Sequence, residues 1–243
     1  MAGTQSYHAG RRRAMTAAPT ILALDSAAAA CSVALWRDGA LAAHRFRPMA
    51  RGHAEALMPM LAETMAAADA AFADLDLVAV TVGPGAFTGL RIGLAVARGI
   101  GLAAGVPVRG VTTLAAVAEA VPAAERLGRA LLVVLDTKRA ELYAQSFGRD
   151  LAPLGDPAVV SPAALAGLLP AGPLLVAGDA AERLRPWLAG RPDAAAWSAA
   201  PGGPDAAAVA RLAARTLAAG DGRGLPPTPL YLQAPAVTLP GSG

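Results

Sequence analysis

The chain has 243 residues, of which 55% are hydrophobic and 16% are charged, a composition that excludes an intrinsically disordered protein and allows one large domain or two smaller lobes. Removing the three basic residues of the first 18 positions from the total of 21 leaves 18, which equals the number of acidic residues. The folded part is therefore formally neutral. Without a basic stripe it is not expected to hold RNA alone, so any RNA contact would be shared with a partner.

The two ends of the chain are expected to lie outside the folded lobes. Residues 1–18 carry three consecutive arginines and no acid, and they lack the long apolar core of a secretory signal. We expect a disordered leader or a natural start at Met15, with a transit peptide as the alternative. Residues 226–243 are rich in proline and predict a tail that runs along the surface.

The first part of the chain predicts a three-stranded meander followed by a helix, a strand, a second helix and a last strand. Apolar runs separated by turn signals such as Asp38-Gly39 indicate the strands. Apolar residues at helical spacing, from Leu57 to Ala68, indicate the first helix. The expected strands span 21–26, 31–36, 41–46, 77–82 and 108–111, and the expected helices span about 52–71 and 88–105.

A second unit repeats this pattern more weakly. Asp25 and Asp136 each end an apolar strand and open a hairpin. This similarity indicates an internal duplication and predicts two lobes, formed by residues 19–112 and 113–225. The expected elements of the second unit are a helix at 114–121, strands at 131–136 and 141–147, and short elements at 174–178 and 209–217.

The segment 83–89, Gly-Pro-Gly-Ala-Phe-Thr-Gly, joins an expected strand to an expected helix, which is a place that can bind anions. It does not match the phosphate-binding P-loop, because Gly89 is followed by Leu90 and not by lysine. It does not match the dinucleotide fingerprint, because Thr88 stands where the third glycine is required. We therefore expect a tight turn in which Gly85 adopts a positive φ and Thr88 caps the helix.

A row of small residues runs along the helix expected after this loop. Its members recur every four positions, at Gly89, Gly93, Ala97, Gly101 and Gly105. Because a glycine costs up to about 1 kcal/mol in a helix interior relative to alanine, such a row favours close approach of another backbone. That backbone can belong to the chain's own sheet, to the helix at 52–71 or to another subunit. The surrounding apolar stretch contains an arginine, several glycines and a proline, and it predicts a poor membrane span.

No constellation in the sequence specifies catalysis. His44 and His53 do not have the spacing of a helical zinc pair, and the chain holds no HExxH, CxxC or GxSxG motif. Cys31, the only cysteine, allows no intrachain disulfide and is expected to act as a small buried hydrophobe, with a Cys/His nucleophile pair as the weaker alternative. Asp25 and Asp136 could hold a magnesium–nucleotide between two hairpins. Hydrogen bonding to turn backbone is the favoured interpretation for both.

The segment 82–93, Val-Gly-Pro-Gly-Ala-Phe-Thr-Gly-Leu-Arg-Ile-Gly, resembles the signature of the TsaB (YeaZ) family. The resemblance covers most of the chain, from Ile21 to Gln233. The supporting segments are Leu24-Asp25-Ser26, Arg51-Gly52-His53-Ala54-Glu55, Asp136-Thr137-Lys138-Arg139-Ala140-Glu141-Leu142-Tyr143 and Pro229-Leu230-Tyr231-Leu232. The family usually has serine at the positions of Ala54 and Ala86, which weakens a role of these side chains in phosphate binding.

The resemblance implies an α/β protein with the two-lobed, ribonuclease H-like fold of actin-like ATPases and sugar kinases. It implies a non-catalytic partner or scaffold subunit of the complex that makes N6-threonylcarbamoyladenosine in tRNA, which binds and activates the larger homologue TsaD together with the ATPase TsaE. Alone the chain is expected to form a homodimer in the cytoplasm, with no membrane contact and with tRNA reached only through the complex. No catalytic residue, metal or cofactor of its own is expected, and ATP or ADP at the complex interface is left open.

In the family the two helices of the first lobe form the subunit interface, which favours another subunit as the neighbour of the small-residue row. The residues expected at this interface are Met58, Met65, Phe87, Gly89, Gly93, Ala97 and Gly101. The residues considered for nucleotide contact are Asp25, Ser26 and Asp136. Two alternatives stay open. One is a glycoprotease-like metallopeptidase, which needs a metal or a nucleophile, and the other is an independent ATPase of the same superfold, which needs phosphate loops in both lobes.

Overall fold

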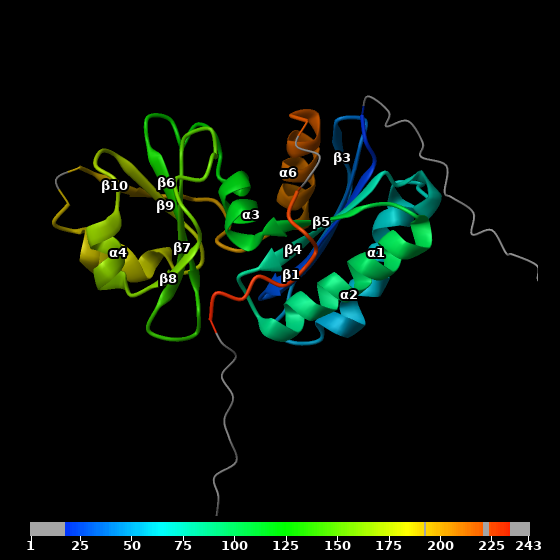
Figure 1. The fold of residues 1–243 in the computed structure, drawn as a ribbon, viewed down its shortest axis with the longest axis horizontal. Coiled ribbons are helices and arrows are strands. Elements are labelled where there is room, and N and C mark those ends of the chain that lie inside the picture. Colours follow the sequence, from blue (N-terminus) through cyan, green and yellow to red (C-terminus); the bar gives the residue numbers. More distant parts are fainter. Residues whose placement is uncertain (1–17, 192, 221–223, 234–243) are drawn as a thin grey trace, which may run out of the picture.

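The computed structural model describes residues 18–191, 193–220 and 224–233 of the chain. It consists of two lobes that lie side by side, each built around a five-stranded sheet (Figure 1). Apart from Ala18, the expected leader falls outside the described residues, as do residues 234–243 of the expected tail.

The first lobe begins with a meander, to which two parallel strands are added. Its strands are β1 (Ile21–Ala28), β2 (Ala30–Arg37), β3 (Ala40–Pro48), β4 (Leu77–Gly83) and β5 (Val108–Thr112), in agreement with the five expected strands. β1 pairs antiparallel with β2 on one side and parallel with β4 on the other, which gives the order β3-β2-β1-β4-β5. Every residue of β4 is buried, as expected for a strand covered on both faces.

The second lobe repeats this topology. Its strands are β6 (Ala130–Asp136), β7 (Leu142–Phe147), β8 (Ala158–Val160), β9 (Leu174–Ala177) and β10 (Ala195–Trp197). The order β10-β9-β6-β7-β8 again places the first strand in the centre, between an antiparallel neighbour and a parallel one. The repeated order confirms the expected fold class, the α/β fold of actin-like ATPases and sugar kinases. The sequence does not predict β8 and β10, because three residues of alanine, valine or tryptophan show no alternation.

Helices cover both faces of the first sheet. The longer helices are α1 (His53–Ala67), α2 (Phe87–Ala104), α3 (Thr113–Ala120) and α6 (Ala206–Ala218), and the short ones are η1 (Phe72–Asp74), α4 (Pro162–Leu168), η2 (Ala181–Leu184) and α5 (Arg185–Leu188). Because side chains alternate along a strand, Leu22 and Leu24 of β1 pack with α1 and α2, whereas Ile21 and Ala23 pack with α6.

The helix α6 joins the two lobes. It lies in the range 113–225, which the sequence assigns to the second lobe, but it packs on β1 and β2 of the first sheet. α3 contacts both α6 and β6, so these two helices lie between the sheets (Figure 1). The chain therefore returns to the first lobe before its tail begins.

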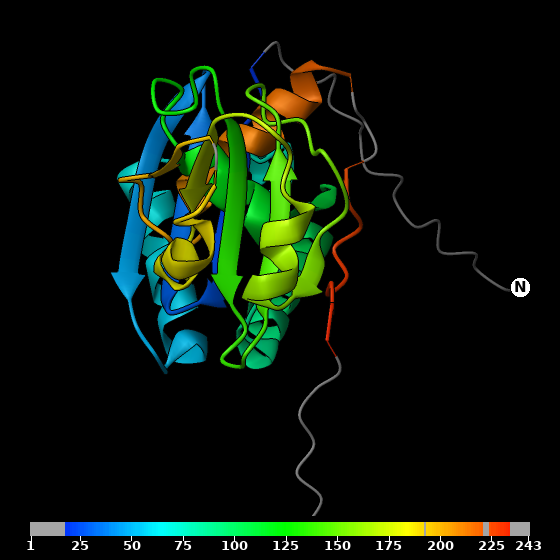
Figure 2. The same cartoon turned by 90° about the vertical axis from the view of Figure 1, so that its left-hand side faces the viewer.

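The described tail, residues 224–233, runs along one side of the molecule (Figure 2). The amide of Gly110 on β5 donates to the carbonyl of Leu225 at 2.7 Å, and the amide of Leu230 donates to the carbonyl of Val82 on β4 at 2.7 Å. The tail is thus fixed to the two parallel strands at the edge of the first sheet.

Within the described part of the chain, α2 is the one helix long and apolar enough to cross a membrane by length and composition. Its inner face packs against the first sheet, where Leu94 and Ala97 belong to the core. The helix therefore has the burial pattern of a core helix, in line with the expected poor membrane span.

Asp205 ties the start of α6 to the first sheet. Its Oδ1 accepts a hydrogen bond from the amide of Ala207 at 2.8 Å and lies 2.7 Å from Nε2 of His44 on β3. Burial alone would raise the pKa of Asp205, but the hydrogen bonds from His44 and Ala207 outweigh it and hold that pKa below its ordinary value. The carboxylate is both a helix cap and the hydrogen-bond partner of His44.

Replacing Asp205 with alanine is expected to lower the free energy of unfolding by about 1–2 kcal/mol at neutral pH, because α6 loses its cap. Asp205→Asn keeps a capping side chain and should cost less. A carboxyl with a lowered pKa stabilises the fold only while it is ionised, so the advantage of wild type over Asp205→Asn should disappear as the pH falls through that pKa. Urea unfolding at several pH values measures both effects, and equal stability of wild type and Asp205→Ala would contradict the capping role.

Candidate functional site

The carboxyl group of Asp25 lies near the end of β1, on the face of the sheet that packs with α6. It is fully buried, and its Oδ1 accepts hydrogen bonds from Oγ1 of Thr81 at 2.7 Å and from the amide of Ala27 at 3.2 Å. Its Oδ2 has no partner among the described residues. Burial raises the pKa of Asp25 to about 6, because the two hydrogen bonds do not compensate for the lost hydration.

The loop 83–89 seals this end of β1. The amide of Ala86 donates to the carbonyl of Ala27 at 2.8 Å, and Oγ of Ser26 donates to the carbonyl of Gly89 at 2.9 Å. A Cβ on Gly89 would lie 2.0 Å from the carbonyl oxygen of Ser26, and one on Gly85 would lie 2.4 Å from that of Ala27. These glycines are therefore required for close approach of two backbones. Ser26 is buried beneath them and Asp25 is buried on the opposite face of β1, which corrects their expected availability to a nucleotide.

The local geometry of the loop also differs from the expectation. The positive φ belongs to Gly83, at 115°, and not to Gly85. α2 begins at Phe87 with Ala86 as its N-cap, so Thr88 lies inside the helix and does not cap it. The sequence identifies the turn but not the position of each residue in it, because two glycines only two positions apart can exchange these roles.

The small-residue row of α2 faces the chain's own sheet. Gly93 lies over Ser26, where an added Cβ would be 2.6 Å from the serine Oγ, and Gly101 lies over the side chain of Val108 on β5. Ala97 is fully buried in the first core. The interface role expected for Gly89, Gly93, Ala97 and Gly101 is therefore wrong, because their own sheet occupies the space that a partner would need. The same holds for Met65, which is buried in this core.

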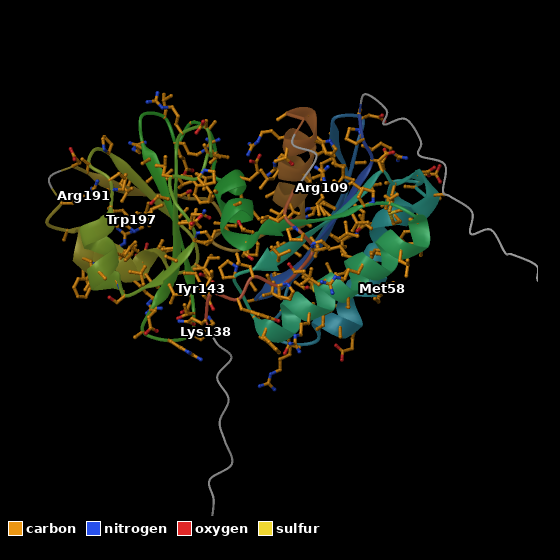
Figure 3. All side chains as sticks on the ribbon, viewed as in Figure 1. Met58, Arg109, Lys138, Tyr143, Arg191 and Trp197 are labelled. Atoms are coloured by element: carbon orange, nitrogen blue, oxygen red, sulfur yellow. The ribbon has the colours of Figure 1, made fainter. Side chains whose placement is uncertain are left out.

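The opposite face of the α1–α2 pair is exposed and largely apolar. Met58 is 49% exposed and Leu102 is 87% exposed, although both are large hydrophobic side chains. Figure 3 shows Met58 on the side of the first lobe that faces away from the second lobe. Gly99 lies on this face with open space around it. Sequence reasoning identified Met58 but missed Leu102 and Gly99. The signal was available, since both lie on the α2 face opposite the small-residue row.

Phe87 is exposed at the start of α2, but other residues of the chain already contact its ring. The ring stacks on that of Tyr231 in the tail, with 5.3 Å between the centroids. The guanidinium of Arg91 lies 3.8 Å from the centroid of the Phe87 ring, and its Nε donates to the hydroxyl of Tyr231. Phe87 therefore fixes the end of the tail to α2.

Asp136 has the structural role that the sequence favours. Its Oδ1 accepts hydrogen bonds from Nη1 of Arg183 at 3.0 Å and from the amide of Lys138 at 2.9 Å, and its Oδ2 pairs with Nζ of Lys138 at 2.9 Å. The hydrogen bond from Lys138 is the main reason why the pKa of Asp136 lies below its ordinary value. Arg183 also donates to the carbonyls of Arg139 and Ala140. The carboxylate thus holds the β6–β7 turn, and Arg183 is the partner that the sequence did not reveal.

Cys31 and the described histidines have structural partners. The Cys31 thiol is buried in the first core, and burial raises its pKa to about 11, as expected for a small buried hydrophobe. Nε2 of His53 lies 3.0 Å from the carbonyl oxygen of Ala28, and His44 pairs with Asp205. Within residues 18–191, 193–220 and 224–233, no three His, Cys, Asp or Glu side chains come together as a metal site would require.

Two cavities lie where the lobes meet. The larger, of about 880 Å³, is bordered by β5, α6, the tail and the loop 150–157. The smaller, of about 220 Å³, is called here the aromatic cavity. It is lined by the loop residues Gly85, Ala86 and Phe87, by Thr137, Arg139 and Tyr143 of the second lobe, and by the tail residues Leu230, Tyr231, Leu232 and Gln233.

The repeated sheet topology and the joined lobes define an α/β protein of the actin-like ATPase and sugar-kinase class. A family model described as "TsaD: tRNA N6-adenosine threonylcarbamoyltransferase" matches residues 47–187. YeaZ from Pseudomonas aeruginosa superposes with a TM-score of 0.75 at 29% identity, over 88% of this chain and 100% of that chain. The chain therefore belongs to the TsaD family, and within it to the TsaB (YeaZ) group that its signature resembles.

The matches to the curated relatives cover about half of each chain. The chain is 38% identical over 130 residues to the tRNA threonylcarbamoyladenosine biosynthesis protein TsaB of Escherichia coli strain K12, covering 54% of this chain and 55% of that protein. It is 36% identical over 126 residues to TsaB of Haemophilus influenzae, covering 51% of this chain and 52% of that protein. The chain thus spans about half the length of these relatives.

The two faces of α2 predict opposite effects of adding one methyl group. Gly89→Ala should destabilise the fold by about 1–3 kcal/mol, because the new Cβ meets the backbone of Ser26. Gly99→Ala, on the open face, should stabilise it by up to about 1 kcal/mol through helix propensity. Chemical denaturation of the two variants gives the comparison. A stable Gly89→Ala variant would show that the loop does not lie on β1 as described.

The buried Asp25 carboxyl predicts a stability that decreases with pH. Its raised pKa means that the folded chain binds the proton more tightly than the unfolded chain, so its contribution is lost as the pH rises from 3.8 through about 6. Asp25→Asn should therefore be more stable than wild type by about 3 kcal/mol at pH 7.5 and equally stable at pH 3. The exposed Asp156→Asn variant serves as the control. A loss of stability in Asp25→Asn at pH 7.5 would contradict the conclusion that the hydrogen bonds of the Asp25 carboxylate do not compensate for its burial.

Proposed function

We propose that this chain is a non-catalytic partner subunit in the biosynthesis of N6-threonylcarbamoyladenosine in tRNA, and that it binds and activates a TsaD protein together with TsaE. Membership of the family and the curated relatives named tRNA threonylcarbamoyladenosine biosynthesis protein TsaB support the pathway. The exposed apolar face of α1 and α2 supports the partner role, and it is the observation on which the proposal depends.

This outer face has the composition of a helix-packing surface. Along α1 the exposed positions Ala54, Met58, Ala62 and Ala66 recur every four residues, and along α2 they are Ala95, Gly99 and Leu102. Small residues with a few large anchors allow another helix pair to approach closely, and methionine adapts to an irregular partner surface. The interface proposed here keeps Met58 from the expected set and replaces the buried small residues by this outer face. Phe87 is left out because its ring is engaged with Tyr231 and Arg91.

The acids considered for nucleotide chemistry are engaged in the fold. Asp25 is fully buried, and Asp136 is bound by Arg183 and Lys138. Their present contacts support a partner role over an independent ATPase. The metallopeptidase alternative would need other residues as metal ligands or nucleophile, because His44, His53 and Cys31 are already in contact with polar groups of the chain.

The remaining properties follow from the partner role. Alone, the chain forms a homodimer through the same helices and exchanges it for the heterodimer when TsaD is added. It carries no cofactor of its own, and any ATP or ADP belongs to the interface of the complex. It meets tRNA within that complex, in the cytoplasm and away from membranes.

Leu102→Glu should weaken association with TsaD by at least about tenfold, because it places a charge at the apolar centre of the proposed interface. The fold should be unaffected, since the side chain is 87% exposed. Leu127→Glu, which alters an equally exposed leucine of the second lobe, is the matched control. Calorimetric titration of each variant with TsaD measures the affinity. Normal binding by Leu102→Glu would show that α2 is not part of the interface. Loss of binding by both variants would show that the effect is not specific to this site.

A further inference from the structure

The aromatic cavity is built by three segments that are far apart in the sequence. The loop 85–87 comes from the first lobe, Arg139 and Tyr143 come from the second lobe, and residues 230–233 come from the tail. Figure 3 shows Tyr143 and Lys138 together on the part of the second lobe nearest to the tail. A site assembled from both lobes and the tail depends on the complete fold, which distinguishes it from an incidental surface hollow.

The aromatic wall of this cavity is held in place. Tyr231 stacks on Phe87 with an angle of 27° between the rings, and its hydroxyl accepts a hydrogen bond from Nε of Arg91 at 3.2 Å. The guanidinium of Arg91 also contacts the Phe87 ring. Both rings stay partly exposed, at 38% for Phe87 and 42% for Tyr231. A fixed and exposed ring is a surface on which a flat ligand can stack with little loss of conformational entropy.

Two lining residues from the second lobe carry polar groups without partners. Lys138 and Arg183 are both bound to Asp136. In contrast, the guanidinium of Arg139 and the hydroxyl of Tyr143 form no hydrogen bond or ion pair with another residue in the part of the chain described. Arg139 is therefore the cation that remains available at the cavity, and Gln233 adds groups that can donate and accept hydrogen bonds.

Stacking rings and an available arginine in one cavity are the chemistry that recognises an unpaired nucleotide, with the base on the rings and a phosphate on the guanidinium. The cavity of about 220 Å³ is smaller than the roughly 300–1,000 Å³ typical of sites for whole small ligands. It accommodates a base rather than a complete nucleoside triphosphate. A base that belongs to an RNA strand fits this limit, because its sugar and phosphate remain outside, next to Arg139.

We infer that the aromatic cavity binds one unpaired base of an RNA strand, stacked at Tyr231, while Arg139 pairs with the neighbouring phosphate. The inference rests on the proposed function, in which the chain meets tRNA inside a complex. It is also consistent with the neutral composition of the lobes, since a single stacked base and one phosphate contact supplement binding by a partner and do not replace it.

The test uses the full chain in complex with TsaD and a fluorescein-labelled RNA stem-loop whose loop is single-stranded and rich in adenosine. Fluorescence anisotropy should show that Arg139→Gln and Tyr231→Leu each weaken RNA binding by about tenfold or more. Tyr231→Phe keeps the ring and should bind like wild type, as should the exposed control Arg149→Gln. Because one phosphate contact is lost, Arg139→Gln should also reduce the slope of log affinity against log salt by about 0.7, a change that a purely structural role would not produce.

Three competing results would overturn the inference. The first is equal RNA binding by wild type, Arg139→Gln and Tyr231→Leu, including no binding by any of them. The second is equal binding of the stem-loop and of the same sequence annealed to its complement. The third is competition by free AMP at the same concentration as the stem-loop, which would assign the cavity to a free nucleotide. Size-exclusion chromatography of the same samples reports whether the TsaD complex forms. A normal complex with unchanged RNA binding would therefore reject the base site alone, and absence of the complex would reject the proposed function.

Discussion

The close approach of the β4–α2 connection to the end of β1 determines the rest of this molecule. At Gly89 the two backbones are so near that a side chain has no room, since a Cβ would lie 2.0 Å from the carbonyl oxygen of Ser26. The hydrogen bonds of Ala86 and Ser26 across the same contact hold the loop in place. The inner face of α2 is then fixed on the sheet, Ser26 is enclosed beneath the loop, and the apolar outer face of α2 is directed to solvent.

The two lobes share a topology but differ at their first hairpins. In the first lobe the acid near the end of the central strand is buried, and one of its oxygens has no partner among the described residues. In the second lobe the corresponding Asp136 is bound by Lys138 and Arg183 and holds its own turn. Neither acid is free toward the space between the lobes. The groups that do face the aromatic cavity come from other positions, namely Arg139, Tyr143 and the tail, which is consistent with binding of a ligand and not with phosphoryl transfer.

The sequence was sufficient for most of the fold. Apolar runs bounded by turn signals placed the five strands of the first sheet, apolar residues at helical spacing placed α1, and the repeated strand–Asp–hairpin pattern predicted the second lobe. β8 and β10 were missed because three residues carry no periodicity. The place of α6 was also missed, because the hydrophobic face of Ala206–Ala218 specifies that it packs but not on which sheet.

The site was less predictable, for a physical reason. A row of small residues such as Gly89, Gly93 and Gly101 indicates that another backbone approaches closely. The same row would be expected whether that backbone belongs to the chain itself or to a partner. Only the three-dimensional arrangement decides between the two. It assigned the row to the first sheet and turned Leu102 and Gly99 outward. The contacts of Arg183 and Tyr231 join segments more than 40 residues apart, so no local pattern could indicate them.

Methionine footprinting tests the central claim, that α1 and α2 use their inner faces for their own sheet and their outer faces for TsaD. Under mild oxidation Met58 should react in the free chain and become protected when TsaD is added, because its exposed thioether is then covered. Met60 and Met65 on the same helix are buried and should stay unreactive in both states. Equal oxidation of Met58 with and without bound TsaD, or oxidation of Met65 in the free folded chain, would contradict it.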